Sequence, residues 1–242
     1  MDFDDLEAKA ADPDAKVMIL CNPHNPAGRV WTEEELRKVG DICLRHNVFV
    51  ISDEIHCELT YPEHDYTPFA SLGEEFRLHS ATCISPSKAF NIAGLQIANI
   101  VTANNEIRAL IDKAININEV CDVNPFGVEA TIAAYTPDGA QWLDELRDYL
   151  HENWLIVRDF FAASIPTCPV TELEGTYLVW IDIRSTGLSS DEVSSRLLDE
   201  QKLMVNSGSM YGGEGFIRLN IACPRSQVVE ALERMAKVLN VH

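Results

Sequence analysis

The sequence predicts an α/β protein with a mostly parallel sheet, followed by a smaller α+β domain. Between about residues 16 and 136, short apolar runs alternate with helical patterns, which is typical of parallel strands joined by crossover helices. From Gly139, apolar residues recur at helical spacing through one long segment, and shorter strand and helix patterns follow. We therefore predict a large domain over residues 1–138, a long inter-domain helix over 139–163 and a small domain over 164–242.

The first region contains four apolar runs that we interpret as strands. They cover residues 17–21, 48–52, 80–84 and 99–102. The first run ends in a loop over residues 22–28, because that segment holds two prolines and a glycine. Thr32 then begins a helix, since Glu35 three residues later completes a capping box. Its apolar stripe is Leu36, Val39, Ile42 and Cys43. Because continuous apolar strands are buried on both sides, we expect helices on both faces of the sheet.

The second region begins with the long helix, whose apolar residues continue to about Ala163. Beyond it we predict strands over 176–183 and 216–221, and helices over 190–202 and 225–239. This order favours a small α+β domain.

The composition excludes several classes of protein. The net charge of −19 and the pI of about 4.6 argue against nucleic acid or an anionic membrane as a partner. No apolar run approaches the ~20 residues of a membrane span, and the acidic N-terminus lacks a signal-peptide pattern. The seven cysteines include no C-x-x-C pair, so we expect no metal site and a cytoplasmic location.

Two predicted strands are followed by groups that suit an aldehyde cofactor. Lys88 comes shortly after the third strand, within Ser-Pro-Ser-Lys, and Asp53 directly follows the second. Residues just beyond the carboxyl ends of strands line the ligand crevice of an α/β sheet. A lysine can bond to an aldehyde, a carboxylate can hold a ring nitrogen protonated, and the hydroxyls of Ser85 and Ser87 could contact a phosphate. This is the chemistry of pyridoxal phosphate (PLP). The alternatives are a solvated loop lysine and an aspartate helix cap.

Three further residues are candidates for the same site. Asn25 offers an amide donor to an anionic ring oxygen, although turn formation also explains an asparagine there. His56 could bond the same oxygen, steer Asp53 or be structural. Arg218 lies inside the apolar run 216–221, where an unpaired arginine is costly. Its forked guanidinium suits a substrate carboxylate, and a salt bridge within the protein is the alternative.

The order and spacing of these residues resemble the fold-type I PLP enzymes of the aminotransferase class I/II superfamily. The matching segments are CNPHNPAGRVW (21–31), ISDEIHCEL (51–59), SPSKAFNIAGLQ (85–96) and FIRLNIACPR (216–225). Asp-Glu-Ile-His is most similar to the cystathionine β-lyase (C–S lyase) branch of the MalY/PatB type, since typical aminotransferases carry tyrosine where His56 stands. The resemblance runs through nearly the whole chain and implies that the first region is the C-terminal part of a PLP-transferase large domain.

The resemblance assigns a role to each candidate residue. Lys88 forms the Schiff base and shuttles protons, Asp53 pairs with the pyridine nitrogen, and Arg218 holds the substrate carboxylate. The residues that it implies for cofactor binding are Asn25, Asp53, His56, Ser85, Ser87 and Lys88. Gln96 departs from the pattern, because many aminotransferases carry a phosphate-binding arginine at that position.

The resemblance also implies that an N-terminal part of the family chain is missing, because only sixteen residues precede the first predicted strand. In family members that part supplies the first strands of the sheet, a phosphate-cradling turn and the aromatic that stacks on the ring. We therefore expect open sheet edges and little or no turnover by these 242 residues alone.

Three functions remain as expectations. The first is a C–S β-lyase acting on sulfur amino acids, and the second is an aminotransferase. The third is a cofactor-free remnant that acts, if at all, as an interaction partner. The resemblance implies a small amino-acid substrate and a homo-oligomer, most simply a dimer.

Overall fold

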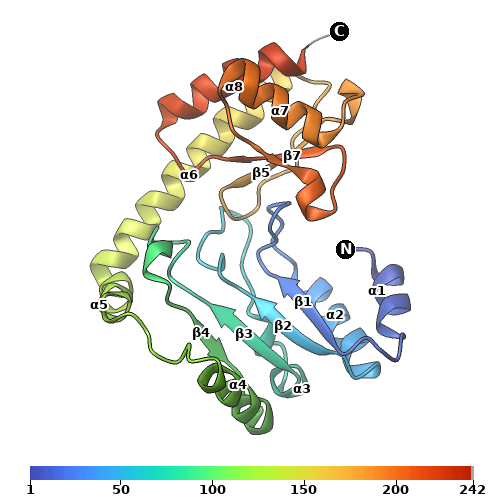
Figure 1. Ribbon diagram of the computed structural model, residues 1–242, viewed down its shortest axis with the longest axis vertical. Coiled ribbons are helices and arrows are strands. Elements are labelled where there is room, and N and C mark those ends of the chain that lie inside the picture. Colours follow the sequence, from blue (N-terminus) through green and yellow to red (C-terminus); the bar gives the residue numbers. More distant parts are fainter. Residues whose placement is uncertain (241–242) are drawn as a thin grey trace. The chain divides into compact units, whose positions relative to one another are not determined.

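The computed structural model describes residues 1–240 and divides into two compact units (Figure 1). Unit 1 comprises Met1–His24 and Val30–Asp144, and unit 2 comprises Asn25–Arg29 and the chain from Glu145 onward. The boundary between Asp144 and Glu145 falls within helix α6 (Pro137–Ser164), which covers the segment predicted as a long helix. The three domains drawn from the sequence stay a prediction.

Unit 1 is built on a four-stranded sheet of order β1-β2-β3-β4. The strands are β1 (Val17–Cys21), β2 (Phe49–Asp53), β3 (Ser80–Ile84) and β4 (Asn99–Val101). β1, β2 and β3 are parallel neighbours, which confirms the mostly parallel sheet. β4 is antiparallel to β3. Only a short 3₁₀ turn, η2 (Ala93–Leu95), lies between β3 and β4, and a parallel pairing would need a longer crossover.

A hydrophobic core packs against the sheet around Leu20 and Val50. The helices that enclose it are α1 (Phe3–Ala10), α2 (Glu33–Arg45), η1 (Phe69–Ser71) and α3 (Glu74–Leu78). The predicted capping box of α2 is present between Thr32 and Glu35, and its apolar stripe is buried as expected. The sequence analysis did not identify α1 or α3.

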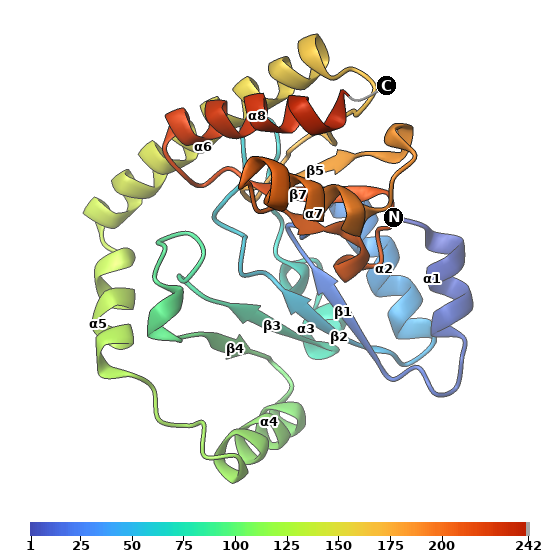
Figure 2. The ribbon, with the colours of Figure 1, turned by 45° about the horizontal axis from the view of Figure 1, so that its top comes forward.

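Two helices follow β4 in unit 1 and lie on the side of the sheet where β4 is the edge strand (Figures 1 and 2). They are α4 (Asn105–Ile117), capped by Asn104, and α5 (Pro125–Ala134), capped by Asn124. None of the side chains of α4 is buried, and Phe126 of α5 is 74% exposed. On β1, which pairs only with β2 in the described part of the chain, Val17 and Ile19 are also exposed.

Unit 2 holds an antiparallel sheet of order β5-β7-β6 and two helices. Its strands are β5 (Leu178–Asp182), β6 (Asn206–Ser207) and β7 (Phe216–Asn220), and its helices are α7 (Ser190–Gln201) and α8 (Arg225–Leu239). These positions confirm the two strands and two helices predicted after α6. Strand β6 has only two residues and was not predicted.

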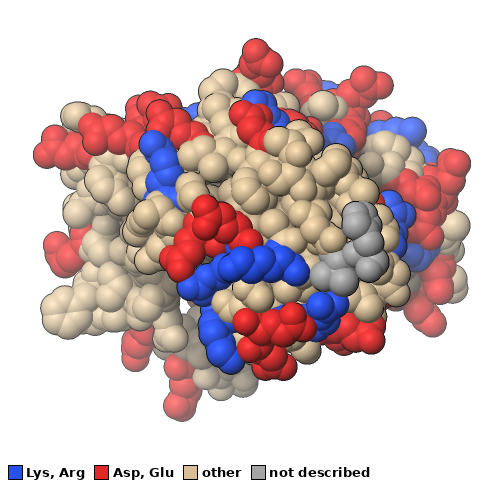
Figure 3. Space-filling model, turned by 90° about the horizontal axis from the view of Figure 1, so that it is seen from above, with Lys and Arg blue, Asp and Glu red and all other residues tan. Residues whose placement is uncertain are grey.

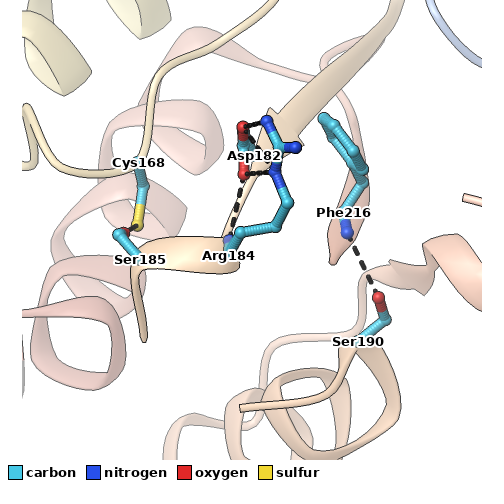
Figure 4. Close-up of polar contacts among 6 residues, drawn as sticks. All are labelled: Cys168, Asp182, Arg184, Ser185, Ser190 and Phe216. Carbon is cyan, nitrogen blue, oxygen red and sulfur yellow. Dashed lines mark hydrogen bonds and ion pairs between the residues drawn. The ribbon is translucent and has the colours of Figure 1, made fainter. Parts of the chain in front are cut away.

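Polar contacts fix the ends of β5 and β7 (Figure 4). Asp182 accepts hydrogen bonds from the backbone N–H and the guanidinium of Arg184, and the guanidinium holds the pKa of that carboxyl below its usual value. The hydroxyl of Ser190 accepts from the backbone N–H of Phe216 at 3.2 Å. The ring of Phe216 stacks on Trp180, with centroids 5.3 Å apart.

The face seen in Figure 3 carries several clusters of acidic side chains, in keeping with the net charge of −19. Among residues 1–240, no helix is long and apolar enough to cross a membrane. The same residues contain no group of three or more His, Cys, Asp or Glu side chains that could hold a metal ion.

Candidate active site

The carboxyl ends of three parallel strands place two of the predicted residues at one edge of the sheet in unit 1. Asp53 is the last residue of β2, and the strand register sets it opposite Cys21 at the end of β1 and Cys83 near the end of β3. Lys88 follows four residues after Ile84, the end of β3. Asp53 therefore ends one parallel strand and Lys88 follows its neighbour, while a site shared by Asp53, Asn25 and Lys88 stays a prediction.

The loop after β2 carries Asp53 and His56. One carboxylate oxygen of Asp53 accepts from the backbone N–H of Ile55 at 3.3 Å, so Asp53 also caps its own turn. The other oxygen makes no hydrogen bond among residues 1–240, which leaves an acceptor for an N–H group. His56 is 4% exposed and lies within the same turn, where its carbonyl accepts from the N–H of Leu59.

A buried carboxylate that the sequence analysis did not single out anchors this loop. Glu54 is 1% exposed and accepts three hydrogen bonds, from the hydroxyls of Ser52 and Tyr66 and from the backbone N–H of Phe69. It thereby ties the end of β2 to the start of η1. In the sequence, the only sign of this role is that Glu54 is an acidic residue just after a buried strand. Tyr66 and Phe69 reach Glu54 only through the fold.

The loop after β3 forms a compact turn around the half-buried Lys88. The hydroxyl of Ser85 donates to the carbonyl of Ile97 at 2.6 Å and accepts from the N–H of Ser87 at 3.1 Å. The N–H of Phe90 bonds the carbonyl of Pro86. In the part of the chain that the structure describes, neither the amine of Lys88 nor the hydroxyl of Ser87 makes a hydrogen bond or ion pair. Of the two serines, Ser87 thus keeps its hydroxyl available, while the hydroxyl proton of Ser85 is engaged within the loop.

Unit 2 contains the other two predicted residues, and they contact each other. One terminal nitrogen of Arg218 donates to the side-chain oxygen of Asn25 at 2.8 Å, and the other donates to Asn206 at 3.1 Å. The guanidinium lies over the ring of Tyr211, 4.6 Å from its centroid. The described residues provide no carboxylate partner for Arg218. The structure therefore does not show the salt bridge that was the alternative for this residue. Asn206 and Tyr211 carried no signal in the sequence.

A tight turn holds Asn25 in place. The carbonyl of Gly28 accepts from the backbone N–H groups of Glu174 and Gly175, at 2.9 Å each, and Arg29 forms an ion pair with Glu174. Gly28 has a φ of +71°, and a Cβ atom there would lie 2.5 Å from Cδ1 of Leu173. Asn25 therefore lies in a tight turn and also contacts Arg218.

Burial and acidic neighbours set the electrostatics near the end of β2. Burial raises the pKa of Glu58, and the hydrogen bond from Tyr135 opposes that shift. Burial, with the charges of Glu58 and Glu54, raises the pKa of Cys57 to about 12. Burial and the neighbouring charge of Asp53 also raise the pKa of Cys83. These cysteines therefore stay as neutral thiols near pH 7 and are poor nucleophiles.

Comparisons with known proteins find one family and several relatives. The family model described as aminotransferase class I and II matches residues 1–235. Cystathionine beta-lyase PatB of Bacillus subtilis (strain 168) is 42% identical, over 99% of this chain and 62% of its own length. Protein MalY of Escherichia coli (strain K12) is 37% identical, over 94% of this chain and 58% of its own length.

Among solved structures, that of cystalysin from Treponema denticola contains a pyridoxal 5'-phosphate cofactor. It is 36% identical, with a TM-score of 0.95, and the match covers 99% of this chain and 61% of that one. The chain thus spans less than two thirds of the length of these relatives.

Proposed function

The chain belongs to the aminotransferase class I and II family, and we propose that it carries the catalytic groups of a PLP-dependent C–S β-lyase of the cystathionine β-lyase type. The substrate class is sulfur amino acids. The position of His56, where typical aminotransferases carry tyrosine, and the identity with PatB favour the lyase over an aminotransferase.

The observation that carries the proposal is that Asp53 ends β2 and Lys88 follows β3, and that these two strands are adjacent and parallel. These side chains fit PLP. Within the described residues, the amine of Lys88 has no acidic partner, and one carboxylate oxygen of Asp53 accepts no hydrogen bond. The Ser87 hydroxyl adds a donor of the kind that phosphate oxygens accept. Bound PLP supplies an electron-accepting ring that stores the charge left when a substrate loses its Cα proton.

In this proposal, the residues of unit 1 hold the cofactor and move protons. Lys88 would hold the cofactor and, as a free amine, would take the proton from Cα of the substrate. The oxygen of Asp53 that accepts no hydrogen bond within the described residues would hold a proton on the ring nitrogen, which would preserve the electron-accepting character of the ring. His56 supports the same loop. Ser87, rather than Ser85, is the serine we assign to the phosphate, with Ser85 shaping the turn.

The residues of unit 2 recognise the substrate. The guanidinium of Arg218 is held by two amide oxygens and by the ring of Tyr211, and its buried Nε has no hydrogen-bond partner among residues 1–240. A substrate carboxylate would give this guanidinium the negatively charged partner that it lacks among the described residues. Because the Oδ1 of Asn25 accepts from Arg218, the amide nitrogen of Asn25 is the atom left to donate.

The proposed reaction cleaves the bond between Cβ and sulfur. Loss of the Cα proton to Lys88 is followed by departure of the thiolate, which takes up a proton. Addition of water then releases ammonia. For cystathionine, one water is consumed and the products are homocysteine, pyruvate and ammonia.

The first experiment tests cofactor attachment. The chain is incubated with PLP, reduced with borohydride, and analysed by intact mass and peptide mapping. We expect one pyridoxyl group on the peptide that contains Lys88, and none in Lys88→Ala. A label spread over several lysines, or one that survives Lys88→Ala, contradicts the assignment.

The second experiment separates the three functions. With cystathionine, a lyase produces pyruvate and ammonia without a keto-acid co-substrate, whereas an aminotransferase needs one and releases a keto acid. A remnant lacks the visible absorbance of lysine-bound cofactor, whereas an incomplete enzyme shows that absorbance with little or no turnover. Arg218→Lys should raise the KM for the amino acid, because an ammonium loses the forked contact with a carboxylate.

We further propose that the protein acts in the cytoplasm as a homodimer. The seven cysteines are all free, which supports a reducing compartment. The strongly acidic surface supports a small-molecule partner rather than nucleic acid. Size-exclusion chromatography with light scattering tests the oligomeric state.

A further inference from the structure

Tyr135, the residue that ends α5, contacts both loops at the sheet edge of unit 1. Its hydroxyl donates to Oε1 of Glu58 at 2.5 Å, and its ring meets the ring of Phe90 edge-on, with centroids 5.7 Å apart. Glu58 comes two residues after His56, and Phe90 comes two residues after Lys88. One side chain therefore bridges the loop that carries Lys88 and the loop that carries Asp53 and His56.

The support on the Lys88 side is firm. Ala89, between Lys88 and Phe90, is fully buried. The ring of Phe90 also stacks on Trp142, near the start of α6, with centroids 5.8 Å apart and planes inclined by 22°. Phe90 is thus held by aromatic side chains from the end of α5 and the beginning of α6, and aromatic pairs of this geometry add to the energy of burial.

The support on the other side is a hydrogen bond at the protein surface, between Tyr135, which is 56% exposed, and the half-buried Glu58. Burial raises the pKa of the Tyr135 hydroxyl, and the neighbouring Glu58 raises it further. Tyr135 therefore remains a donor at neutral and mildly alkaline pH. A bond from a hydroxyl to a carboxylate is stronger than one between neutral groups when the carboxylate is ionised.

We propose that Tyr135 is a positioning residue of the active site, which fixes the Lys88 loop and the Asp53–His56 loop relative to each other for the cofactor. The inference rests on the proposed function, since it assigns the two loops to one PLP site. Tyr135 acts through Glu58 and Phe90, and it need not touch the cofactor itself.

The test uses substitutions that separate the two contacts. Tyr135→Phe keeps the ring on Phe90 and removes the hydroxyl, whereas Tyr135→Leu removes both contacts. Glu58→Ala removes the acceptor, and Glu58→Gln restores one. The matched control is Tyr149→Phe in unit 2, which also loses one hydrogen bond of a tyrosine hydroxyl, in that case from the N–H of Arg225.

The first readout is hydrogen exchange of the chain without cofactor. The reporters are backbone amides bonded within each loop, those of Cys57 and Leu59 on one side and those of Phe90 and Ile92 on the other. Loss of one hydrogen bond should speed exchange of the Cys57 and Leu59 amides about fivefold in Tyr135→Phe. Tyr135→Leu should speed all four amides.

Two comparisons distinguish positioning from a general loss of stability. Glu58→Ala should match Tyr135→Phe, the double variant should be no faster than either single one, and Glu58→Gln should restore slow exchange. The urea midpoint of Tyr135→Phe should match that of Tyr149→Phe, which leaves all four amides unchanged. Faster exchange across the whole chain in Tyr135→Phe, or no change at the reporters, overturns the bridge.

The second readout is PLP affinity, measured by titration of the visible absorbance of lysine-bound cofactor. Tyr135→Phe and Glu58→Ala should each raise the apparent dissociation constant about fivefold, again the loss of one hydrogen bond, whereas Glu58→Gln, which keeps an acceptor, should keep the native value. Unchanged affinity in both Tyr135 variants overturns the positioning role. If the native chain itself shows no lysine-bound cofactor, the proposed function fails and the cofactor role fails with it, while the exchange experiment still decides whether Tyr135 couples the loops.

Discussion

Replacing Gly28 by alanine should destabilise unit 2 more than the same change at another glycine of equal backbone conformation. At φ +71°, alanine meets the cost of the left-handed region, about 1 kcal/mol. In addition, its Cβ would lie 2.5 Å from Cδ1 of Leu173 and 3.3 Å from the carbonyl oxygen of Gly175. Leu173 is 2% exposed, so it has little room to move. Overpacking of this kind costs about 1–3 kcal/mol, which brings the total for Gly28→Ala to about 2–4 kcal/mol.

Gly187→Ala is the matched control. Gly187 has a φ of +69°, and no heavy atom lies within 4 Å of a Cβ placed there. It should therefore show only the backbone cost of about 1 kcal/mol. Urea unfolding followed by circular dichroism measures both free energies of unfolding. Equal losses in the two variants would refute the reasoning, because they would mean that Leu173 gives way without cost.

Three further predictions concern unit 1. Glu54→Leu leaves two buried donors and the part-buried Tyr66 hydroxyl unsatisfied and should cost about 3–5 kcal/mol of unfolding free energy. Glu129→Leu on the exposed face of α5 should stay within about 0.5 kcal/mol. Similar urea midpoints would contradict the importance of the Glu54 network. Because burial raises the folded pKa of Glu58 above its unfolded value of 4.5, the stability of the native chain should fall as the pH rises from below 4.5 through the raised pKa. Glu58→Gln should gain stability relative to the native chain as the pH rises through this range. Urea unfolding across a pH series measures the gain. No gain would mean that burying the ionised Glu58 carboxylate costs nothing. Burial raises the pKa of Cys43 to about 11, so a thiol reagent near pH 8 should label the exposed Cys121 well before Cys43, and the reverse order would contradict the assignment.

Much of the fold could be predicted because its strongest signals are local. The capping box at Thr32, the apolar stripe of α2 and the continuous apolar strands each specify an element within a few residues. Helices α4 and α5 were harder to predict. The apolar residues Ile107, Leu110, Ile111 and Ala114 of α4 do lie at helical spacing, but no side chain of this helix is buried, so its apolar face does not pack into the core of the described chain. The two residues of β6 are too short for any periodicity.

The candidate site could also be predicted only in part. Lys88, Asp53 and Arg218 could be found because a charged group beside or within an apolar strand is unusual, and because their spacing resembles that of a known family. The residues that hold them could not. Tyr66 reaches Glu54, and Asn206 reaches Arg218, only through the fold, and neither sits in a pattern that predicts such a contact.

The assignment of residues 25–29 to unit 2 means that the chain passes between the two units three times, at 24/25, 29/30 and 144/145. A protease that cuts within α6 between Asp144 and Glu145 would not simply release the two parts. The N-terminal fragment would still carry Gly28, while the N–H groups that its carbonyl binds, on Glu174 and Gly175, would belong to the C-terminal fragment. We expect such a nicked protein to stay together as a non-covalent pair. The same break point is then a natural place to divide the protein for fragment complementation.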